Sequence, residues 1–364
     1  MLLIGQLHYE TTSKYNFPRI IKEIELSERI VELSVNTMRM IKGRILQISN
    51  MNFADPIIES YENSEEHIPI KGRILSALLN SLKPIRDGTP IIGVDVSSIK
   101  VGATDIGVIY AVRGAVVQRI NGKYWYFRLG PLPFHVTKRN FQEIIGECDV
   151  DIPFDPSISL SYEPQRQLCN LIERWLRMCI SHFARGNLIL WDGSLTAGVP
   201  GSPTKEMSEI LRVARENSNT VMGFSKYTTL KFLDWKITDL INGYKPPCLF
   251  EIDSLPLLSN SRLKLLGRIY VAKLARGGCS FRLDIDRCIS SEECIRAVER
   301  LIGNERIYQG YPETLRLAHI YSTFTASDVI GIQRLLVRRY GLRLVAQSNM
   351  HRTLFGPYGT KIGG

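Results

Sequence analysis

The sequence lacks the cysteine and histidine patterns of a zinc site. Its seven cysteines are odd in number and form no Cys-x-x-Cys pair, and its six histidines are scattered along 364 residues. A structural zinc site needs closely spaced ligands, so this pattern gives a Cys/His site no support. Reduced thiols are typical of the cytosol, and we expect a cytoplasmic protein without disulfides. Any metal would be held by carboxylates.

Long apolar runs, internal repeats and low-complexity tracts are also missing. No uninterrupted apolar segment approaches the roughly 18–20 residues that a membrane-spanning helix needs. The first residues turn polar too soon for a signal peptide. Hydrophobic residues make up 44% of the chain and charged residues 23%, which is ordinary globular usage. We therefore expect a globular protein that is neither membrane-bound nor mainly disordered.

The positive charge of the chain is unevenly placed. The net charge is +10; residues 1–255 contain 29 Lys/Arg against 28 Asp/Glu, whereas residues 256–364 contain 17 against 8. A basic segment is commonly a solvated surface. It can also bind a phosphate backbone, because neutralising phosphates releases counterions. The last third is therefore a candidate for nucleic-acid binding, most plainly at Arg334, Arg338 and Arg339.

The first 85 residues read as mainly helical. Apolar residues recur at helical spacing between residues 19 and 45, and residues 71–82 suit a second helix that stops near Pro84. Residues 51–70 are polar and predict a loop. We expect a helical N-terminal region over residues 1–85, and an α/β region over residues 86–364.

The α/β region opens with a predicted antiparallel meander over residues 91–129. Asn121–Gly122 stands between two β-rich runs, and this dipeptide favours a tight hairpin because both residues tolerate positive φ. Asp95 lies on the first strand. A helix follows over 163–182 with Glu173 off its apolar stripe, and a short buried strand then ends at Asp192.

The rest of the chain alternates strands and helices. A strand over 220–224 runs into Lys226, and paired strands are predicted at 268–273 and 280–284. A short helix after Tyr311 carries His319. The last predicted helix spans residues 327–340 and ends before a glycine.

The order of three acids along this pattern is informative. An acid on a first strand, a meander, a helix with an acid and a strand ending in an acid is the order found in the RNase H-like fold. Clustered carboxylates repel one another unless a hard cation such as Mn²⁺ or Mg²⁺ neutralises them. Two such ions can activate water against a phosphodiester. Taken singly, Asp95 could cap a strand, Asp192 could start a turn and Glu173 could be solvated; the ordered set favours a metal site.

Several motifs occur in the order found in one family, and over about residues 90–360 the chain resembles the NurA nucleases of archaea and some bacteria. The Asp-Gly-Ser-Leu block and the block that joins Tyr-Pro to Ala-His are the more specific. The matching stretches are Ile92–Ser97, Leu188–Leu195, Val221–Lys226, Phe281–Asp284, Gly310–Pro312 with Ala318–His319, and Phe355–Pro357.

The resemblance implies an RNase H-like core with helices around a mixed sheet, one or two Mn²⁺ or Mg²⁺ ions, and a homodimer. It also implies a single-strand endonuclease and 5′-to-3′ exonuclease that acts with a HerA-type hexameric ATPase in DNA end resection and repair. The residues carried over as metal ligands and catalytic groups are Asp95, Glu173, Asp192, Lys226, Tyr311 and His319. Lys226 would also contact DNA.

Some alternatives stay open at this point. Glu163 competes with Glu173 as the helical acid, although its place before Pro164 also suits simple dipole complementarity. Asp284 and Asp286 read as support for the site and are left out of the ligand set. A non-catalytic adaptor that loads the ATPase on DNA, and an enzyme acting on RNA–DNA hybrids, are the rival functions. The N-terminal helices could be a partner surface, or could be ordinary helices packed on the core or across a dimer.

Overall fold

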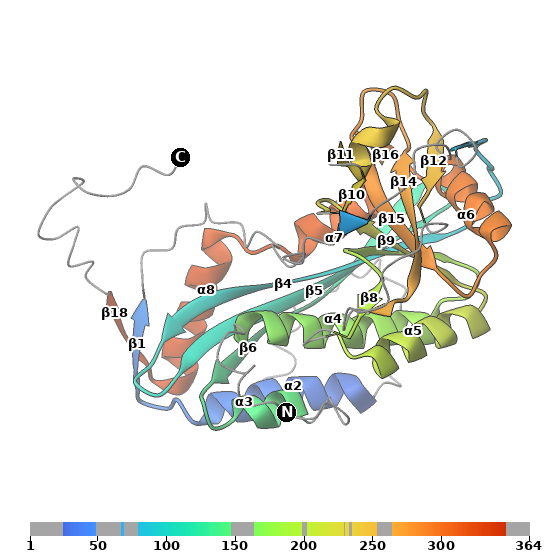
Figure 1. Ribbon diagram of the computed structural model, residues 1–364. Helices are drawn as coiled ribbons and strands as arrows, with labels where there is room; N and C mark the ends of the chain where they lie inside the picture. Colours follow the sequence, from blue (N-terminus) through green and yellow to red (C-terminus); the bar gives the residue numbers. More distant parts are fainter. Residues whose placement is uncertain are drawn as a thin grey trace, which may run out of the picture.

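A computed structural model describes residues 25–48, 67–68, 79–146, 164–198, 202–228, 230–232, 235–252 and 264–346. Its centre is one large mixed sheet of 11 strands, with helices on both faces (Figure 1). No helix in the described part of the chain is long and apolar enough to cross a membrane.

Three long strands form the antiparallel meander that the sequence predicts. They are β4 (Ile91–Ala103), β5 (Val108–Ile120) and β6 (Lys123–Val136). Asn121 and Gly122 both take positive φ, at 50° and 76°, in the turn between β5 and β6. The hairpin signal is therefore confirmed, and the last strand runs seven residues past the predicted end at 129.

Two parallel strands continue the sheet on the other side of β4. They are β7 (Leu188–Asp192) and β9 (Thr220–Ser225), and both run parallel to β4. The resulting order β6-β5-β4-β7-β9, with only β5 reversed, is that of an RNase H-like core, so the predicted fold class is confirmed. The sheet then extends through antiparallel strands β15 (Phe281–Asp286), β14 (Gly267–Lys273), β12 (Cys248–Glu251) and β3 (Leu79–Ser81).

Amphipathic helices cover the two faces of this core (Figure 1). On one face lie α4 (Pro164–Phe183) and α5 (Thr204–Glu216), and the apolar stripe of α4 packs on Val94, Val96 and Trp191 of the sheet. On the opposite face lie α6 (Ser291–Asn304) and α7 (Glu313–Ser322), which pack on alternate residues of the same strands. Because side chains alternate along a strand, each central strand residue packs against only one of the two helix layers.

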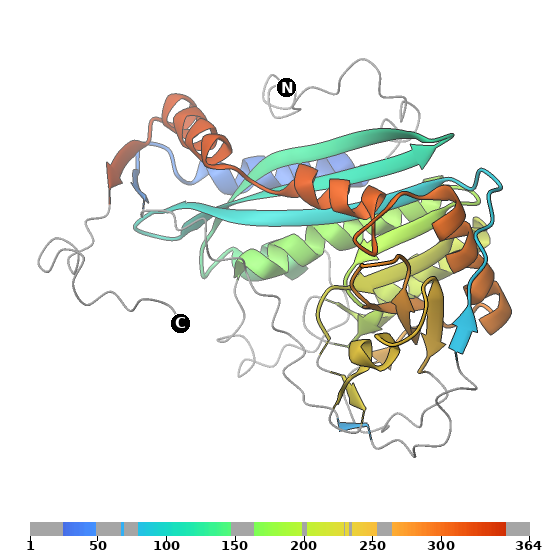
Figure 2. The ribbon, with the colours of Figure 1, turned by 90° about the horizontal axis from the view of Figure 1, so that it is seen from above.

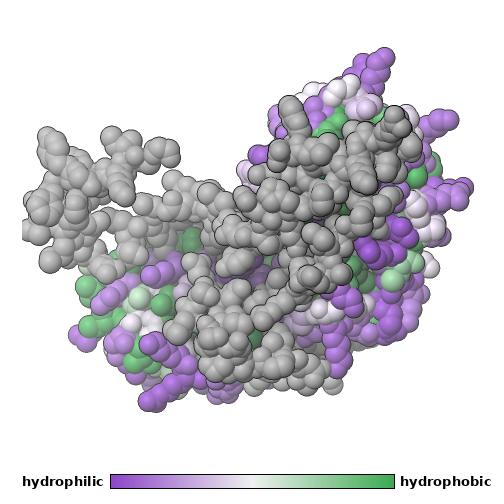
Figure 3. All heavy atoms as spheres, viewed as in Figure 1, coloured by the Kyte–Doolittle hydropathy of each residue, from purple (hydrophilic) through white to green (hydrophobic). Residues whose placement is uncertain are grey.

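A further group of elements packs at the far end of the meander (Figure 2). It consists of α2 (Glu25–Arg39), β1 (Ile45–Ile48), α8 (Ala326–Tyr340) and β18 (Arg343–Ala346). Buried Arg113 of β5 forms an ion pair with Asp328 in the first turn of α8, at 2.8 Å. Removing one partner of a buried pair costs up to about 3–5 kcal/mol, so this pair holds α8 on the sheet. Apolar side chains stay exposed on β1 and β18, at Ile45, Leu344 and Val345. Green side chains gather below the grey atoms on the left of Figure 3.

The remaining elements are short and surround the sheet. They are β2 (His67–Ile68), α3 (Phe141–Gly146), β8 (Thr196–Ala197), β10 (Lys231–Phe232), β11 (Trp235–Lys236), η1 (Ile237–Ile241), β13 (Lys264–Leu265), β16 (Ile307–Tyr308) and β17 (Tyr311–Pro312).

The N-terminal prediction is partly wrong. Residues 79–81 form β3, paired with β12, where the sequence predicted the end of a helix over 71–82; residues 71–78 lie outside the described residues. Of the helix predicted over 19–45, the described part is α2, and the chain turns into β1 at Ile45. Because β1 and β3 belong to the central sheet, the N-terminal region contributes strands as well as helix. The boundary at residues 85/86 stays a prediction.

Candidate metal centre

Two acids lie side by side where β4 and β7 separate. The parallel pairing of these strands ends at Val94 with Trp191, so Asp95 and Asp192 are the next residues in register. Neighbouring strands are about 4.8 Å apart, which brings the two carboxylates close together. Val94 and Trp191 point into the core beneath α4. The two acids therefore point to the opposite face, toward α7.

The same edge of β4 has an opening beyond Asp95. After Val94 the edge makes its next pairing with a described strand at Ala103, which contacts Gln47 of β1. The sheet is thus interrupted between β7 and β1 on this side of β4. Groups from either face can approach Asp95 there without crossing a hydrogen-bonded ladder.

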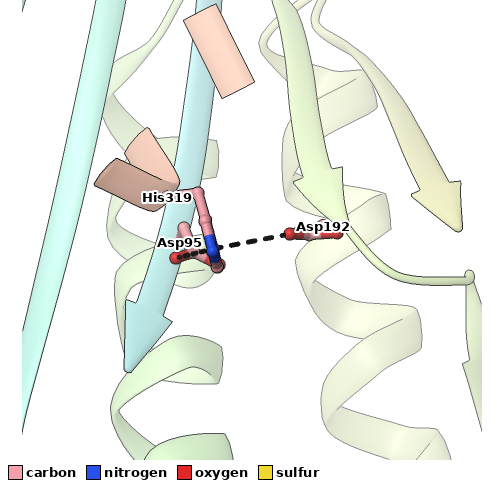
Figure 4. A group of neighbouring side chains, drawn as sticks. All are labelled: Asp95, Asp192 and His319. Carbon is pink, nitrogen blue, oxygen red and sulfur yellow. Dashed lines mark ion pairs between the residues drawn. The ribbon is translucent and has the colours of Figure 1, made fainter. Parts of the chain in front are cut away.

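Helix α7 brings His319 to the two acids (Figure 4). Its Nδ1 lies 3.3 Å from Oδ2 of Asp95 and 4.0 Å from Oδ2 of Asp192. The helix can sit this close because Gly93 faces it: a Cβ at this position would lie 2.9 Å from the backbone oxygen of Thr314. Glycine thus lets the helix backbone rest directly on the strand.

Positively charged or chargeable side chains partly neutralise the carboxylates of Asp95 and Asp192. Nζ of Lys226, one residue past β9, lies 2.5 Å from Oδ2 of Asp192. Burial raises the pKa of Asp192 above its usual range, although the ammonium of Lys226 opposes this. The pKa of His319 is also raised, chiefly by its hydrogen bond to Asp95. The two carboxylates are thus mostly buried, whereas the imidazole and the ammonium beside them are partly exposed to solvent.

The donor atoms fit a hard divalent cation. One ligand atom each from Asp95, Asp192 and His319 lie within 4.8 Å of one another, and no other such group of three occurs among the residues that the structure describes. Carboxylate oxygens are the donors that suit Mn²⁺ and Mg²⁺, and the added imidazole nitrogen favours the transition metal Mn²⁺ over Mg²⁺. The two carboxylates are buried, and Lys226 and His319 neutralise them only in part. A bound metal ion would neutralise them more fully, which adds to the fit.

A serine that the sequence did not single out also contacts Asp95. Ser322, at the end of α7, is fully buried, and its hydroxyl is within hydrogen-bonding distance of Oδ2 of Asp95. Ser97 lies two residues beyond Asp95 on β4, and its hydroxyl donates to the backbone oxygen of Ser322 at 2.5 Å. The only available signal was spacing: Ser322 stands one helical turn after His319, on the same side of the helix.

Tyr311 lies beside the cluster, in the apolar core that faces α7. Its ring packs edge-on against Phe224 and at a tilt against Phe281, with centroid distances of 5.9 and 5.3 Å. Nζ of Lys226 lies 5.7 Å from the ring centroid. The ring of Tyr311 therefore lies next to the ammonium of Lys226, at the edge of the site.

Glu173 approaches the site from the other face of the sheet and is not part of the three-residue group. Its carboxylate pairs with Arg177 one turn later, and the guanidinium of Arg177 also donates to the backbone oxygen of Asp192 at 3.4 Å. One turn earlier, the thiol of Cys169 contacts the backbone oxygen of Val96 at 3.3 Å. Glu173 therefore lies between two contacts that flank the opening beside β4. Glu163 lies outside the described residues.

The three arginines proposed to bind DNA are all exposed on α8. Their helix is tied to the far end of β4, because the amide of Gln333 donates to the backbone oxygen of Val101 at 2.9 Å. Val101 lies six residues beyond Asp95 on β4, a distance of roughly 20 Å. These arginines thus lie well away from the acids.

Asp284 and Asp286 have structural partners. Arg282 donates to both oxygens of Asp284, and the backbone N–H of Leu195 donates to Oδ2 of Asp284 at 2.9 Å. Asp286 is paired with Arg215 at 2.5 Å. Asp284 therefore links β15 to the segment that follows β7, and Asp286 links β15 to α5.

Comparison with solved structures finds distant relatives. The NurA nuclease from Sulfolobus solfataricus is 16% identical with a TM-score of 0.45, covering 72% of this chain and 88% of that one. A NurA structure bound to dAMP and manganese is 12% identical with a TM-score of 0.43, covering 73% and 92%. An endonuclease V from Bacillus subtilis is 10% identical with a TM-score of 0.32, covering 72% and 88%. The fold assignment rests on the strand order and not on these matches.

The sequence itself carries the family assignment. No curated protein matches the chain. The NurA domain, by contrast, matches residues 89–322. This span begins just before β4, which carries Asp95, and stops at the end of α7, which carries His319. That span covers more than half of the chain and every member of the acidic cluster, and the protein therefore belongs to the NurA family.

Proposed function

We propose that this protein is a metal-dependent DNA nuclease that hydrolyses phosphodiesters at the cluster of Asp95, Asp192 and His319. The observation that carries the proposal is the convergence of their ligand atoms within 4.8 Å, beside the ammonium of Lys226. Two carboxylates, one imidazole and one lysine are the groups that phosphodiester hydrolysis needs: ligands for a hard cation and a positive charge for the phosphate.

Each residue then has a distinct part. Asp95, Asp192 and His319 would hold Mn²⁺ or Mg²⁺, which when bound supplies a Lewis acid for water and for the leaving oxygen. Lys226, released from Asp192 when the cation takes its place, would bind the phosphate as a point charge. The ring of Tyr311 faces the ammonium of Lys226 and would help to orient it.

Glu173 is proposed as a further ligand that enters through the opening beside β4. Its position between Cys169 and Arg177 supports this, because both neighbours contact backbone at the opening. To reach a cation, the carboxylate would have to leave Arg177. Whether one or two ions bind therefore depends on this side chain.

The finer parts of the function come from the family resemblance. We propose single-strand endonuclease and 5′-to-3′ exonuclease activity, dependence on manganese, a homodimer, and a role in DNA end resection with a HerA-type ATPase.

The N-terminal region is one candidate partner surface. Because α2 packs against β6 through Ile30 and Val31, a test should alter its exposed residues rather than delete it. Glu32→Arg on α2, combined with Met40→Asp just after it, is expected to weaken ATPase binding, and unchanged binding would place the partner surface elsewhere.

The deciding experiment is Mn²⁺-dependent digestion of labelled DNA by wild type and by Asp95→Asn. We expect wild type to cut DNA and Asp95→Asn to be inactive, with exposed Asp239→Asn as a control of equal charge change and full activity. Single-stranded DNA, duplex DNA and an RNA–DNA hybrid are compared side by side. No cleavage by wild type would favour the adaptor, and preference for the hybrid would favour the other enzyme class.

A further inference from the structure

The hydroxyl of Ser322 lies near two hydrogen-bond acceptors and can donate its proton to only one of them. It lies within hydrogen-bonding distance of Oδ2 of Asp95 and, at 2.9 Å, of the backbone oxygen of His319. A hydroxyl has a single proton to donate. The His319 oxygen already accepts the backbone N–H of Thr323 at 3.1 Å and its hydroxyl at 2.7 Å. The carboxylate is the stronger acceptor, so the proton of Ser322 goes to Asp95.

The position of Ser322 is itself fixed by the sheet. Ser97 donates to the backbone oxygen of Ser322 at 2.5 Å, and Ser97 and Asp95 are on the same face of β4. At the next residue, Nη1 of Arg113 donates to the backbone oxygen of Thr323 at 3.0 Å. The end of α7 is thus held by β4 and β5 at two successive carbonyls, and the hydroxyl of Ser322 cannot drift from Asp95.

We propose that Ser322 is a positioning residue that holds the Asp95 carboxylate in the orientation in which it binds the metal ion. The inference rests on the proposed function. An aspartate has a freely turning carboxyl group, and a hydrogen bond to one oxygen fixes the direction in which both oxygens present their lone pairs. Partners of metal-binding carboxylates typically change metal affinity roughly 10- to 100-fold. Full burial of Ser322 removes competing water and makes the effect of its loss measurable.

The chain offers a matched control at the neighbouring residue. The hydroxyl of Thr323 donates to the same His319 oxygen but has no contact with Asp95, and Thr323 is exposed. Thr323→Ala therefore removes a hydroxyl from the same helix end without touching the carboxylate. Ser322→Ala removes the hydrogen bond and leaves a small void, whereas Ser322→Cys fills the void with a poor donor.

The test titrates the full-length, DNA-free protein with Mn²⁺ alone and measures free Mn²⁺ by electron paramagnetic resonance. We expect Ser322→Ala and Ser322→Cys each to weaken Mn²⁺ binding about 10-fold, and Thr323→Ala to stay within about twofold of wild type. Thermal unfolding of each variant checks that it is folded. Cleavage by the Ser322 variants should recover when Mn²⁺ is raised, because the defect lies in affinity.

The outcomes separate the inference from the proposed function. If wild type binds Mn²⁺ and cleaves DNA while Ser322→Ala binds as tightly as wild type, the positioning role is wrong and the nuclease stands. Wild-type affinity in Ser322→Cys with a loss only in Ser322→Ala would also overturn it, because packing alone would then explain the loss. If wild type neither binds Mn²⁺ nor cleaves DNA, the proposed function itself fails.

Discussion

The two faces of the sheet at the β4–β7 opening differ in how they hold their acids. On the α7 face, Asp95 and Asp192 lie among Lys226, His319 and Ser322. On the α4 face, Glu173 pairs with Arg177, which is 8% exposed and stacks 4.4 Å from the ring of Trp191.

This difference concerns how easily each cation can leave. The side chain of Lys226 is 36% exposed and can move into solvent when a metal ion arrives. Arg177 is buried between a carboxylate and an indole, and moving it away would break a largely buried ion pair, which is costly. We infer that the α7 face is ready to take a metal ion, whereas the α4 face must first rearrange.

The largest expected effect comes from removing either acid of the α7 face. Asp192→Asn should abolish Mn²⁺ binding and cleavage, an effect greater than the roughly 10- to 100-fold typical of outer partners. The double variant with Asp95→Asn should be no worse than either single one, since both residues act as one site. A kinetic comparison of the three variants checks this, and additive effects would show two independent sites.

The α4 face is tested by Glu173→Gln. We expect Mn²⁺ affinity and cleavage to fall about 10-fold or more if the carboxylate joins the site. The matched control is Glu206→Gln. Glu206 of α5 pairs with Arg174 of α4 at 2.7 Å, on the side of α4 that faces α5. Equal behaviour of the two variants in Mn²⁺ titrations would confine metal binding to the α7 face.

A smaller effect should appear as pH dependence of metal binding. The pKa of His319 is raised above its ordinary value of 6.5, chiefly by Asp95, so a cation must displace a proton to reach Nδ1. Mn²⁺ affinity should therefore rise with pH up to the raised pKa of His319 and then level off, and this rise should be absent in His319→Asn.

The same shift affects stability with the opposite sign. Without metal, protonated His319 stabilises the folded protein fully below pH 6.5, and the contribution is lost as pH rises through the raised pKa. Unfolding of metal-free wild type and His319→Asn along a pH series measures it. A pH-independent difference between the two proteins would show that His319 is not charged in the fold.

The smallest effect on chemistry is expected from the distant arginines of α8. Changing Arg334, Arg338 and Arg339 to Gln should weaken binding of long DNA at low salt. The slope of log affinity against log salt should become shallower by about 0.9 for each phosphate that the protein no longer neutralises. Cleavage of a short oligonucleotide that cannot span roughly 20 Å should stay unchanged. Unaltered affinity for long DNA would remove α8 from the DNA path.

Local patterns predicted the elements that form the centre of the fold. The Asn-Gly turn and the β-rich runs around it were enough for the meander. Asp95 and Asp192 were visible because each follows a short apolar run that is typical of a buried strand. The helix predicted over 71–82 was wrong at its end. A short apolar segment is ambiguous by itself, and Leu79–Ser81 becomes a strand through pairing with β12, far along the chain.

The site could be predicted only as far as residue order determines it. Asp95 and Asp192 follow from strand register, and the family motif located His319. The sequence could not show that Glu173 lies across the sheet, because that depends on how α4 is rotated about its axis. Nor could it identify Ser322, whose partner Asp95 is more than 200 residues earlier in the chain.

The contact at Gly93 bears on which ion the protein can choose. Mg²⁺ takes oxygen ligands at about 2.0–2.1 Å and Ca²⁺ at about 2.3–2.6 Å, so a few tenths of an ångström separate a fitting ion from a loose one. A methyl group at residue 93 would press on the backbone of Thr314 and lift α7, and His319 with it, by a similar amount. Gly93→Ala should therefore shift the ratio of Mn²⁺ to Ca²⁺ affinity toward Ca²⁺, and an unchanged ratio would show that the helix yields elsewhere. We therefore infer that the close contact between strand and helix at Gly93 limits the radius of the ion that this site accepts.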